Sequence, residues 1–448
     1  MERDRTKNKR CELLAPAGSK EAFIAAVESG ADAIYVGGTL FNARMNAKNL
    51  SDEDMAEAIA FAHKRRVRVY VTVNTLIKDS ELPVAVGYCG RLREMGADGI
   101  IIQDLGLGRA VREAYPDLPI HLSTQGSVYD LKGVRAAEKL GYSRVVIERQ
   151  LSLDEIREVC SGTETEIEVF CHGALCFCYS GQCQLSRHIG GRSANRGECA
   201  QPCRMEYKVT GTDGKRGSGF MLSPADLCML EHIDELIDAG VASLKIEGRM
   251  KSPEYVSEVT AVYRMRIDEY YSAREAEDEA PAHPDEKSDL ARLTQIYSRG
   301  FTDGFLSGQE DGGFMSGSTS KNRGVMVGRV KGVLGRGGRS GGHLIEVETF
   351  RGIGRGDSLE IRRRERGGEK AVASCLVTYL DGRTLGDVKP YEGEAVRPGD
   401  AVFRITEKAQ MESAALSYRN KDWHSGKFSR RMPVRLYITE LPAVEGHI

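Results

Sequence analysis

Short apolar runs alternate with amphipathic stretches along residues 12–249 of the chain. The amphipathic stretches, such as SKEAFIAAVESG and SDEDMAEAIAFAHKRR, end in Gly or in basic residues, as helix C-termini often do. Continuous apolar strands separated by helices indicate a parallel sheet that is covered on both faces. Eight runs are predicted strands: ELLAPAG from Glu12, DAIYVGG from Asp32, RVYVTVNT from Arg68, GIIIQD from Gly99, PIHLSTQ from Pro119, RVVIER from Arg144, EIEVFCHG from Glu166 and SLKIEGR from Ser243.

Eight such units predict a closed, TIM-like (β/α)8 barrel, which we place in residues 1–280. A doubly wound open sheet is the alternative, but no GxGxxG motif follows the first strand, which disfavours a dinucleotide-binding fold. In barrel enzymes the active site lies at the C-terminal ends of the strands. Polar residues, which could instead be helix or turn caps, stand at several of these ends: Asn74, Asp104, Gln125, Glu148, Arg149, His172, Glu247 and Arg249.

The second half of the chain has a different pattern. Residues 281–323 predict a helical linker followed by a Gly/Ser-rich connector. Residues 324–410 contain short alternating segments separated by turn signals, which predicts a small antiparallel β-barrel. Residues 411–448 form a C-terminal extension. It ends in one more predicted strand, MPVRLYITE, and we expect that strand to begin a further domain.

Cysteines gather in residues 168–207, directly after the seventh predicted strand. The chain of 448 residues has 11 Cys, a net charge of -2, no apolar leader after MERDRTKNKR and no apolar run long enough to span a membrane. We therefore expect a cytoplasmic protein with reduced thiols, in which a Cys cluster more often binds a metal or an iron–sulfur cluster than forms disulfides. The small net charge gives no global reason to expect nucleic-acid binding, so any RNA affinity must come from local patches.

The cysteine spacing leaves several interpretations open. Neither pair, Cys176 with Cys183 or Cys199 with Cys203, has the short CxxC spacing of a zinc ribbon, whereas iron–sulfur ligation tolerates irregular spacing. Cys228 is the substitute fourth ligand, and Cys171 and Cys178 are expected to be small buried residues. A nucleophilic Cys paired with His172 is the competing hypothesis.

The segment EVFCHGALCFCYSGQCQLS resembles the signature of the collagenase-like peptidases, peptidase family U32. ELLAPAGSKEAFIAAVESGADAIYVGG and SLKIEGRMKSPEYV resemble other blocks of that family, and the resemblance covers residues 12–405. IGGRSANRGECAQPCR is most similar to the subgroup that makes 5-hydroxycytidine in bacterial 23S ribosomal RNA; related members hydroxylate a tRNA uridine or assist ubiquinone hydroxylation. The resemblance implies prephenate as a co-substrate and a 4Fe-4S cluster, whose ligands fall on Cys176, Cys183, Cys199 and Cys203.

Prephenate has two carboxylates, which require fixed cations. Arg149, Lys245 and Arg249 are the candidate substrate-binding residues, because guanidinium binds carboxylate in a bidentate manner. The alternative is a structural ion pair among Lys245, Glu247 and Arg249. His172, Asn74, Gln125 and Glu247 are candidate catalytic residues that could orient substrate or transfer protons.

We expect ribosomal RNA, or alternatively tRNA, as the partner, with the basic segments 331–339 and 362–366 contacting phosphates. Two other functions stay open: a peptidase, and a non-catalytic, cluster-bearing scaffold for a hydroxylase.

Overall fold

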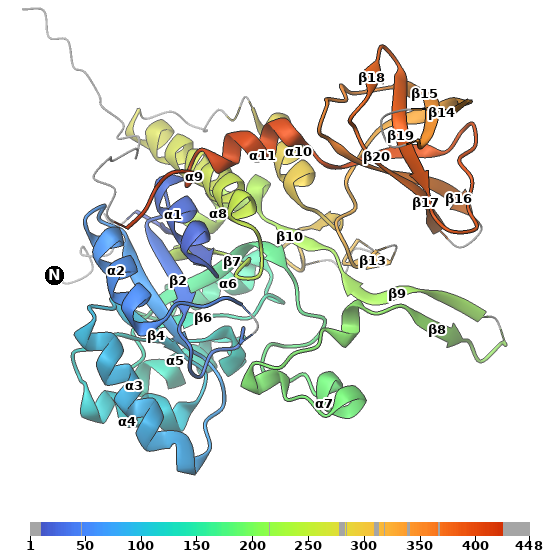
Figure 1. Ribbon diagram of the computed structural model, residues 1–448. Helices are drawn as coiled ribbons and strands as arrows, with labels where there is room; N and C mark the ends of the chain where they lie inside the picture. The colour runs from blue at the N-terminus through green and yellow to red at the C-terminus, as the bar shows by residue number, and fades with distance from the viewer. Residues whose placement is uncertain are drawn as a thin grey trace, which may run out of the picture.

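The computed structural model describes residues 10–423, apart from residues 46, 215, 277–282, 284, 309–312, 318, 338–340 and 366–367. Its larger part is a closed barrel of eight parallel strands (Figure 1). Neighbouring strands pair in chain order, and β11 pairs with both β7 and β1 to close the barrel. The predicted (β/α)8 fold is therefore confirmed, with strands β1 Glu12–Ala17, β2 Ala33–Gly37, β3 Arg68–Val73, β4 Gly99–Ile102, β5 Ile120–Leu122, β6 Arg144–Val146, β7 Glu166–Ala174 and β11 Ser243–Ile246.

Helices cover the outside of this barrel. Several begin at a Ser or Asp whose side chain accepts a backbone N–H of the first turn, the usual N-cap arrangement. Asp104 is one of these caps, because it accepts from the Leu107 amide at 2.9 Å. That strand-end residue is therefore accounted for by its helix. The covering helices are α1 Lys20–Glu28, α2 Asp52–His63, α3 Leu82–Glu94, α4 Leu105–Ala114, α5 Leu131–Lys139, α6 Leu153–Ser161, α8 Ile233–Asp238 and α9 Pro253–Glu275.

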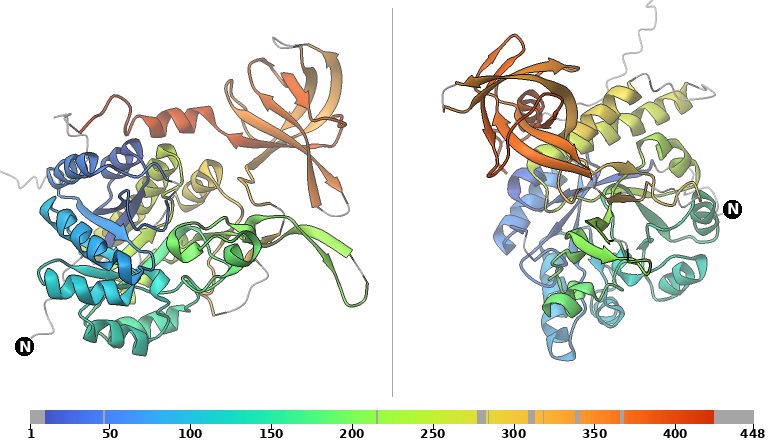
Figure 2. Two further views of the ribbon diagram at one scale, coloured as in Figure 1. Left: turned by 60° about the horizontal axis from the view of Figure 1, so that its bottom comes forward. Right: turned by 90° about the vertical axis from the view of Figure 1, so that its right-hand side faces the viewer.

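A long excursion interrupts the barrel between β7 and β11. It contains the cysteine-rich segment, the short helix α7 (Leu185–Gly190) and a hairpin formed by β8 (Tyr207–Thr210) and β9 (Arg216–Pro224). The hairpin projects away from the barrel and has β13 (Met315–Gly317) on its other edge (Figure 2). The chain then returns through β10 (Asp226–Cys228), which pairs antiparallel with β7 and also contacts β12 (Phe301–Thr302).

The smaller part is an antiparallel barrel closed by the pairing of β15 with β19. The predicted small β-barrel is therefore present, but the sequence pattern missed β19. Its segment TLGDVKP contains Gly, Asp and Pro, which are depleted in strands. The strands of this barrel are β14 Val325–Arg336, β15 His343–Thr349, β16 Ser358–Glu365, β17 Gly368–Leu376, β19 Thr384–Pro390 and β20 Ala401–Thr406, and a short β18, Leu380–Asp381, pairs with β19.

Two helices connect the parts. The helix α10 (Glu286–Ile296) leads from the large barrel toward the small one, and α11 (Lys408–Ala415) returns along α9 (Figure 1). The segment after α11 ends at Trp423, whose ring packs edge-on against Phe23 and Phe61 with centroid distances of 5.4 Å. The predicted strand MPVRLYITE lies outside the described residues. None of the described helices is long and apolar enough to cross a bilayer.

Candidate functional site

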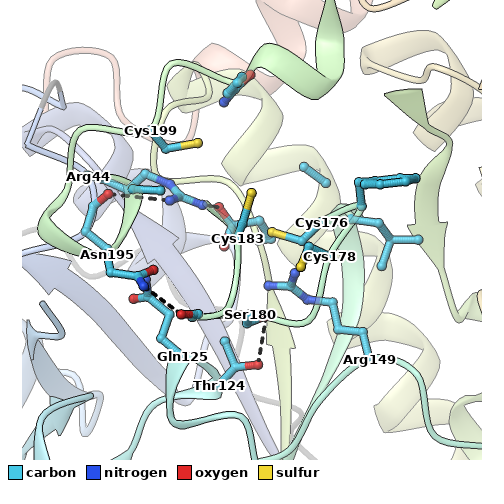
Figure 3. Close-up of a pocket in the computed structure, with 18 of the residues that line it drawn as sticks. Arg44, Thr124, Gln125, Arg149, Cys176, Cys178, Ser180, Cys183, Asn195 and Cys199 are labelled. Atoms are coloured by element: carbon cyan, nitrogen blue, oxygen red, sulfur yellow. Dashed lines mark hydrogen bonds and ion pairs between the residues drawn. The ribbon is translucent and has the colours of Figure 1, made fainter. Parts of the chain in front are cut away.

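A cavity of about 430 Å³ opens at the C-terminal ends of the barrel strands and is roofed by the cysteine-rich segment (Figure 3). This volume is in the usual range for small-molecule sites. The cavity collects most of the predicted site residues although they come from separate strands. Its lining includes Asn74, Gln125, Arg149, Cys176, Cys183, Cys199, Cys203, Lys245, Glu247 and Arg249.

All four predicted cysteine ligands lie around this cavity. Cys176 and Cys199 are exposed, whereas Cys183 and Cys203 are partly buried. Burial raises the pKa of the Cys203 thiol to about 11; Arg204 opposes this shift, and Cys176, Cys199 and Cys183 add to it. The Cys203 thiol therefore lies within electrostatic range of the other three thiols.

Four cysteine thiols from one loop segment are a donor set of the kind that holds an iron–sulfur cluster. Among the described residues, no three His, Cys, Asp or Glu side chains approach closely enough to hold one ion. A cluster is larger than an ion, and its thiolates come from loops and stand farther apart. Cys178 also lines the cavity, in contrast to the expectation that it would be a buried filler.

Cys171 and Cys228 are not part of the cavity lining. The Cys171 thiol is fully buried and donates to the Lys245 carbonyl at 3.4 Å, and burial raises its pKa strongly. Cys228 lies on β10 with its sulfur 3.7 Å from the Tyr263 hydroxyl. The geometry therefore favours Cys203 over Cys228 as the fourth thiolate.

The cysteine-rich segment is anchored to the barrel through Ser180. Its hydroxyl donates to Glu148 at 3.1 Å and accepts from Thr124 at 3.4 Å, while its carbonyl accepts from Ser127 at 2.5 Å. Burial raises the pKa of the Glu148 carboxyl to about 7, against the opposing effect of Arg149. Glu148, at the end of β6, is therefore a support of the cysteine-rich segment behind the cavity.

Arg149 is a cation without a hydrogen-bond partner for two of its nitrogens. Its Nε and Nη1 atoms are buried, and neither donates a hydrogen bond to an acceptor in the described part of the chain. The guanidinium lies 4.0 Å from the centroid of the Phe170 ring and faces the cavity (Figure 3). Leaving charged donors unpaired is costly, so this arrangement indicates a site for an anionic ligand.

The other two predicted substrate cations already have partners. Lys245 Nζ lies 2.9 Å from Glu168 Oε1 in the barrel interior. Arg249 donates to three uncharged side chains: Thr72 at 3.0 Å, Asn42 at 3.3 Å and Asn49 at 2.6 Å. Burial lowers the pKa of Arg249 to about 10. The ion pair considered for Lys245, Glu247 and Arg249 is thus not formed, because each of the three has a partner elsewhere.

Glu247 instead pairs with Arg44, which approaches Oε1 at 3.2 Å from the loop after β2. Burial favours the neutral carboxyl, but Arg44 and then Arg149 outweigh it, so the pKa of Glu247 lies below its ordinary value. Glu247 is therefore ionised at neutral pH, and it can accept hydrogen bonds but cannot donate a proton.

Asn74 and Gln125 form one hydrogen-bonded pair in the cavity wall. The Asn74 amide donates to Gln125 Oε1 at 3.1 Å, and Asn74 Oδ1 accepts from the Ala43 backbone at 3.0 Å. These contacts fix both amide groups at the rim. Both side chains line the cavity, and their role in orienting a substrate stays a prediction; a carboxamide supplies no acid or base at neutral pH.

His172 lies outside the cavity lining because of an irregularity in β7. Phe170 pairs with Lys245 and His172 pairs with Ile246, so one residue of β7 is skipped. This β-bulge turns His172 to the outer face of the barrel wall. There its ring packs against Tyr263, Tyr255 and Phe301, and burial lowers its pKa to about 4.

The sequence analysis did not single out several other residues that line the cavity, among them Tyr35, Arg44, Arg204 and Arg299. Arg44 follows the second strand, so the strand-end rule would have found it if the loop had been included. Arg299 pairs with Asp226, and Arg204 donates to the Leu175 carbonyl at 3.0 Å. Arg204 directly follows Cys203 in the cysteine-rich segment, whereas Arg299 comes from the segment after α10, and no sequence signal marks Arg299.

The basic segments of the small barrel are less free than their sequence suggests. Lys331 pairs with Glu346 at 2.9 Å, Arg362 with Glu360 at 2.6 Å and Arg363 with Asp400 at 2.8 Å. Acidic residues on the same or a neighbouring segment thus neutralise these cations. Arg336 and Arg364 are exposed and keep the phosphate-binding hypothesis open.

A family model described as peptidase family U32 matches residues 18–315, more than half of the chain. The chain belongs to peptidase family U32. This U32 protein is 42% identical over 270 residues to the tRNA hydroxylation protein P1 of Bacillus subtilis, covering 58% of this chain and 64% of the relative. It is 38% identical over 323 residues to the 23S rRNA 5-hydroxycytidine C2501 synthase of Escherichia coli, covering 72% of this chain and 49% of the relative.

A third U32 relative has a different name. The protein named collagenase from Porphyromonas gingivalis is 34% identical over 321 residues, covering 67% of this chain and 74% of that protein. The chain thus spans 49% to 64% of the length of the two RNA-related relatives above and a larger share of the collagenase. Family membership is therefore plain, and the relatives divide between RNA hydroxylation and proteolysis.

Proposed function

We propose that this U32 protein hydroxylates a pyrimidine base in RNA, with 5-hydroxycytidine in 23S ribosomal RNA as the product, using prephenate and an iron–sulfur cluster. The observation that carries the proposal is one cavity that brings together four cysteines and the unpaired Arg149 guanidinium. The names of two relatives, one acting on rRNA and one on tRNA, support RNA as the substrate class.

The cysteines Cys176, Cys183, Cys199 and Cys203 would hold the 4Fe-4S cluster. When bound, such a cluster supplies an electron-transfer or Lewis-acidic centre at the cavity. The protein's own side chains bind and orient the substrates. Arg149 donates to a carboxylate of prephenate, Glu247 holds Arg44 beside it, and the amides of Asn74 and Gln125 orient the polar groups of the substrate.

A peptidase is the second candidate, since one relative is named collagenase. A cysteine peptidase needs a histidine within reach of its thiolate. The described residues that line the cavity include no histidine, and His172 faces α9 on the other side of the wall. The cavity therefore favours hydroxylation over proteolysis.

The deciding experiment is nucleoside mass spectrometry of rRNA and tRNA from a strain that lacks the gene. We expect one hydroxylated pyrimidine to disappear from 23S rRNA and to return when the gene is restored, but not when a Cys176→Ser gene is supplied. Loss of a hydroxyuridine from tRNA would show that the substrate is tRNA. Unchanged nucleosides in both RNAs, together with cleavage of a peptide substrate by the purified protein, would establish the peptidase. The modification could be lost in the deletion strain and yet require a second protein when it is reconstituted in vitro. That result would show that this protein is a scaffold for a separate hydroxylase.

A further inference from the structure

Three aromatic side chains at the rim of the cavity are exposed to solvent. Phe177 and Tyr179 are 42% and 47% exposed, belong to the cysteine-rich segment and line the cavity. Tyr129, 55% exposed, lies just ahead of α5, and its ring centroid is 5.7 Å from that of Tyr179. Aromatic rings normally bury most of their surface, so a group of exposed rings beside a cavity marks a binding surface.

The rings stand on a segment that is fixed in place. The residue after Tyr179 is the buried Ser180, which is held by Glu148, Thr124 and Ser127. Gly181 follows with a φ of +81°, and a Cβ there would lie 2.1 Å from the Gln125 carbonyl oxygen. The backbone is therefore pressed against the barrel, and little entropy would be lost when a ligand binds the rings.

The charge of the same segment favours an anionic partner. Between Cys176 and Arg204 the chain has four arginines and one glutamate. Arg187 on α7 and Arg192 just after it are exposed, and α7 begins with Leu185, which lines the cavity. Exposed guanidinium groups and exposed aromatic rings on one segment match the two parts of a nucleotide, its phosphate and its base.

We propose that Phe177, Tyr179 and Tyr129 form a stacking platform for an unpaired base of single-stranded RNA, with Arg187 and Arg192 contacting the neighbouring phosphates. This inference rests on the proposed function and specifies the form of its RNA substrate. The rings of Tyr129 and Tyr179 are inclined by 50°, so they are not stacked on each other and each keeps a face for a base. A base inside a duplex has no free face, and enzymes that act on a base take it out of the stack.

The test measures binding of a short unstructured pyrimidine ribo-oligonucleotide, and of its duplex, to the full chain purified without air. We expect the single strand to bind more tightly than the duplex. Phe177→Ala and Tyr179→Ala should each weaken single-strand binding by about tenfold, because base–aromatic stacking contributes on this order. The slope of affinity against salt should not change, because the rings are uncharged. Tyr391→Ala, at a ring 42% exposed on the small barrel, is the matched control and should bind normally.

Three further variants separate the explanations. Tyr179→Phe should keep the affinity, whereas Tyr179→Leu, which keeps apolar bulk without an aromatic face, should lose it. Arg187→Ala with Arg192→Ala should flatten the salt slope. Wild-type affinity in Tyr179→Leu, or a preference for duplex, would overturn the platform. Sedimentation measures whether Tyr179→Ala changes self-association. If it does while the RNA affinity stays unchanged, the rings belong to a protein contact, and this result would also overturn the platform. If the single strand binds as expected but the gene deletion changes no nucleoside, the proposed function fails and the platform stands.

Discussion

The Nδ1 atom of His172 lies 3.2 Å from the hydroxyl of Tyr263, on the side of the barrel wall that faces α9. The Tyr263 hydroxyl also donates to the Cys171 carbonyl at 2.9 Å, so it keeps a partner without His172. The pair connects the last long helix to the bulged strand β7. The His172–Tyr263 pair therefore stabilises the barrel wall behind the cavity. A substrate bound in the cavity could not reach His172 there.

His172→Phe should preserve RNA modification and change the response of the fold to acid. Burial holds the folded-state pKa of His172 at about 4, below the unfolded value of about 6.5. A depressed histidine pKa stabilises the fold above pH about 6.5, and this contribution is lost as pH falls toward 4. Urea unfolding at several pH values should show a weaker acid dependence in the variant. Loss of modification with an unchanged acid dependence would restore a catalytic role for His172.

Cys203→Ser should release the iron–sulfur cluster, whereas Cys228→Ser should retain it. Cys203 lines the cavity with the three other thiols, and Cys228 contacts Tyr263 behind it. Iron and sulfide content and the visible absorption of protein purified without air measure the difference. A full cluster in Cys203→Ser, with loss in Cys228→Ser, would reverse the assignment. Stoichiometric zinc in place of iron and sulfide would exclude the cluster itself.

Arg149→Met should chiefly reduce activity, whereas Arg249→Met should chiefly reduce stability. Arg149 has two buried nitrogens without a hydrogen bond, so its removal should abolish modification while the free energy of unfolding stays the same or rises. Arg249 satisfies Thr72, Asn42 and Asn49, so its removal should cost about 1–3 kcal/mol of stability. Thermal unfolding and nucleoside analysis of both variants make the comparison. Arg157→Ala, at an exposed arginine of α6, is the control.

Glu148→Gln should make the stability of the protein less dependent on pH between about 4.5 and 7. Burial raises the folded-state pKa of Glu148 to about 7. A raised pKa contributes stability that is fully present below the unfolded value of about 4.3 and is lost as pH rises through 7. The wild type should therefore lose about 2–3 kcal/mol across this window relative to the variant. Parallel pH profiles of the two proteins would show that Glu148 is already ionised in the fold.

Replacing Arg336 and Arg364 with Ala should weaken RNA binding and reduce its salt dependence. Both residues are exposed on the small barrel, whereas Lys331, Arg362 and Arg363 are paired with carboxylates. Fewer phosphate contacts release fewer counterions, so the slope of log affinity against log salt should fall. Arg363→Ala is the contrasting variant and should chiefly lower the melting temperature. An unchanged affinity and slope after the double replacement would leave the small barrel without a role in RNA binding.

The sequence by itself determined the barrel and the position of its site. The eight apolar runs from Glu12 to Ser243 predicted buried strands, and the helical stretches between them predicted parallel order. Placing the cysteines directly after β7 also fixed them at the rim, because that rim is where strands end. Local pattern and chain connectivity were sufficient for these features.

Tertiary structure decided which polar side chains face the cavity and which cations are free. His172 was expected at the rim because it stands at the end of the seventh predicted strand, but a single bulge in β7 turns it to the other face of the wall. Lys245 and Arg149 look alike as basic strand-end residues. Glu168 neutralises Lys245, whereas Nε and Nη1 of Arg149 have no hydrogen-bond acceptor among the described residues. Pairing depends on contacts between residues far apart in the chain, and such contacts are settled only when the barrel closes.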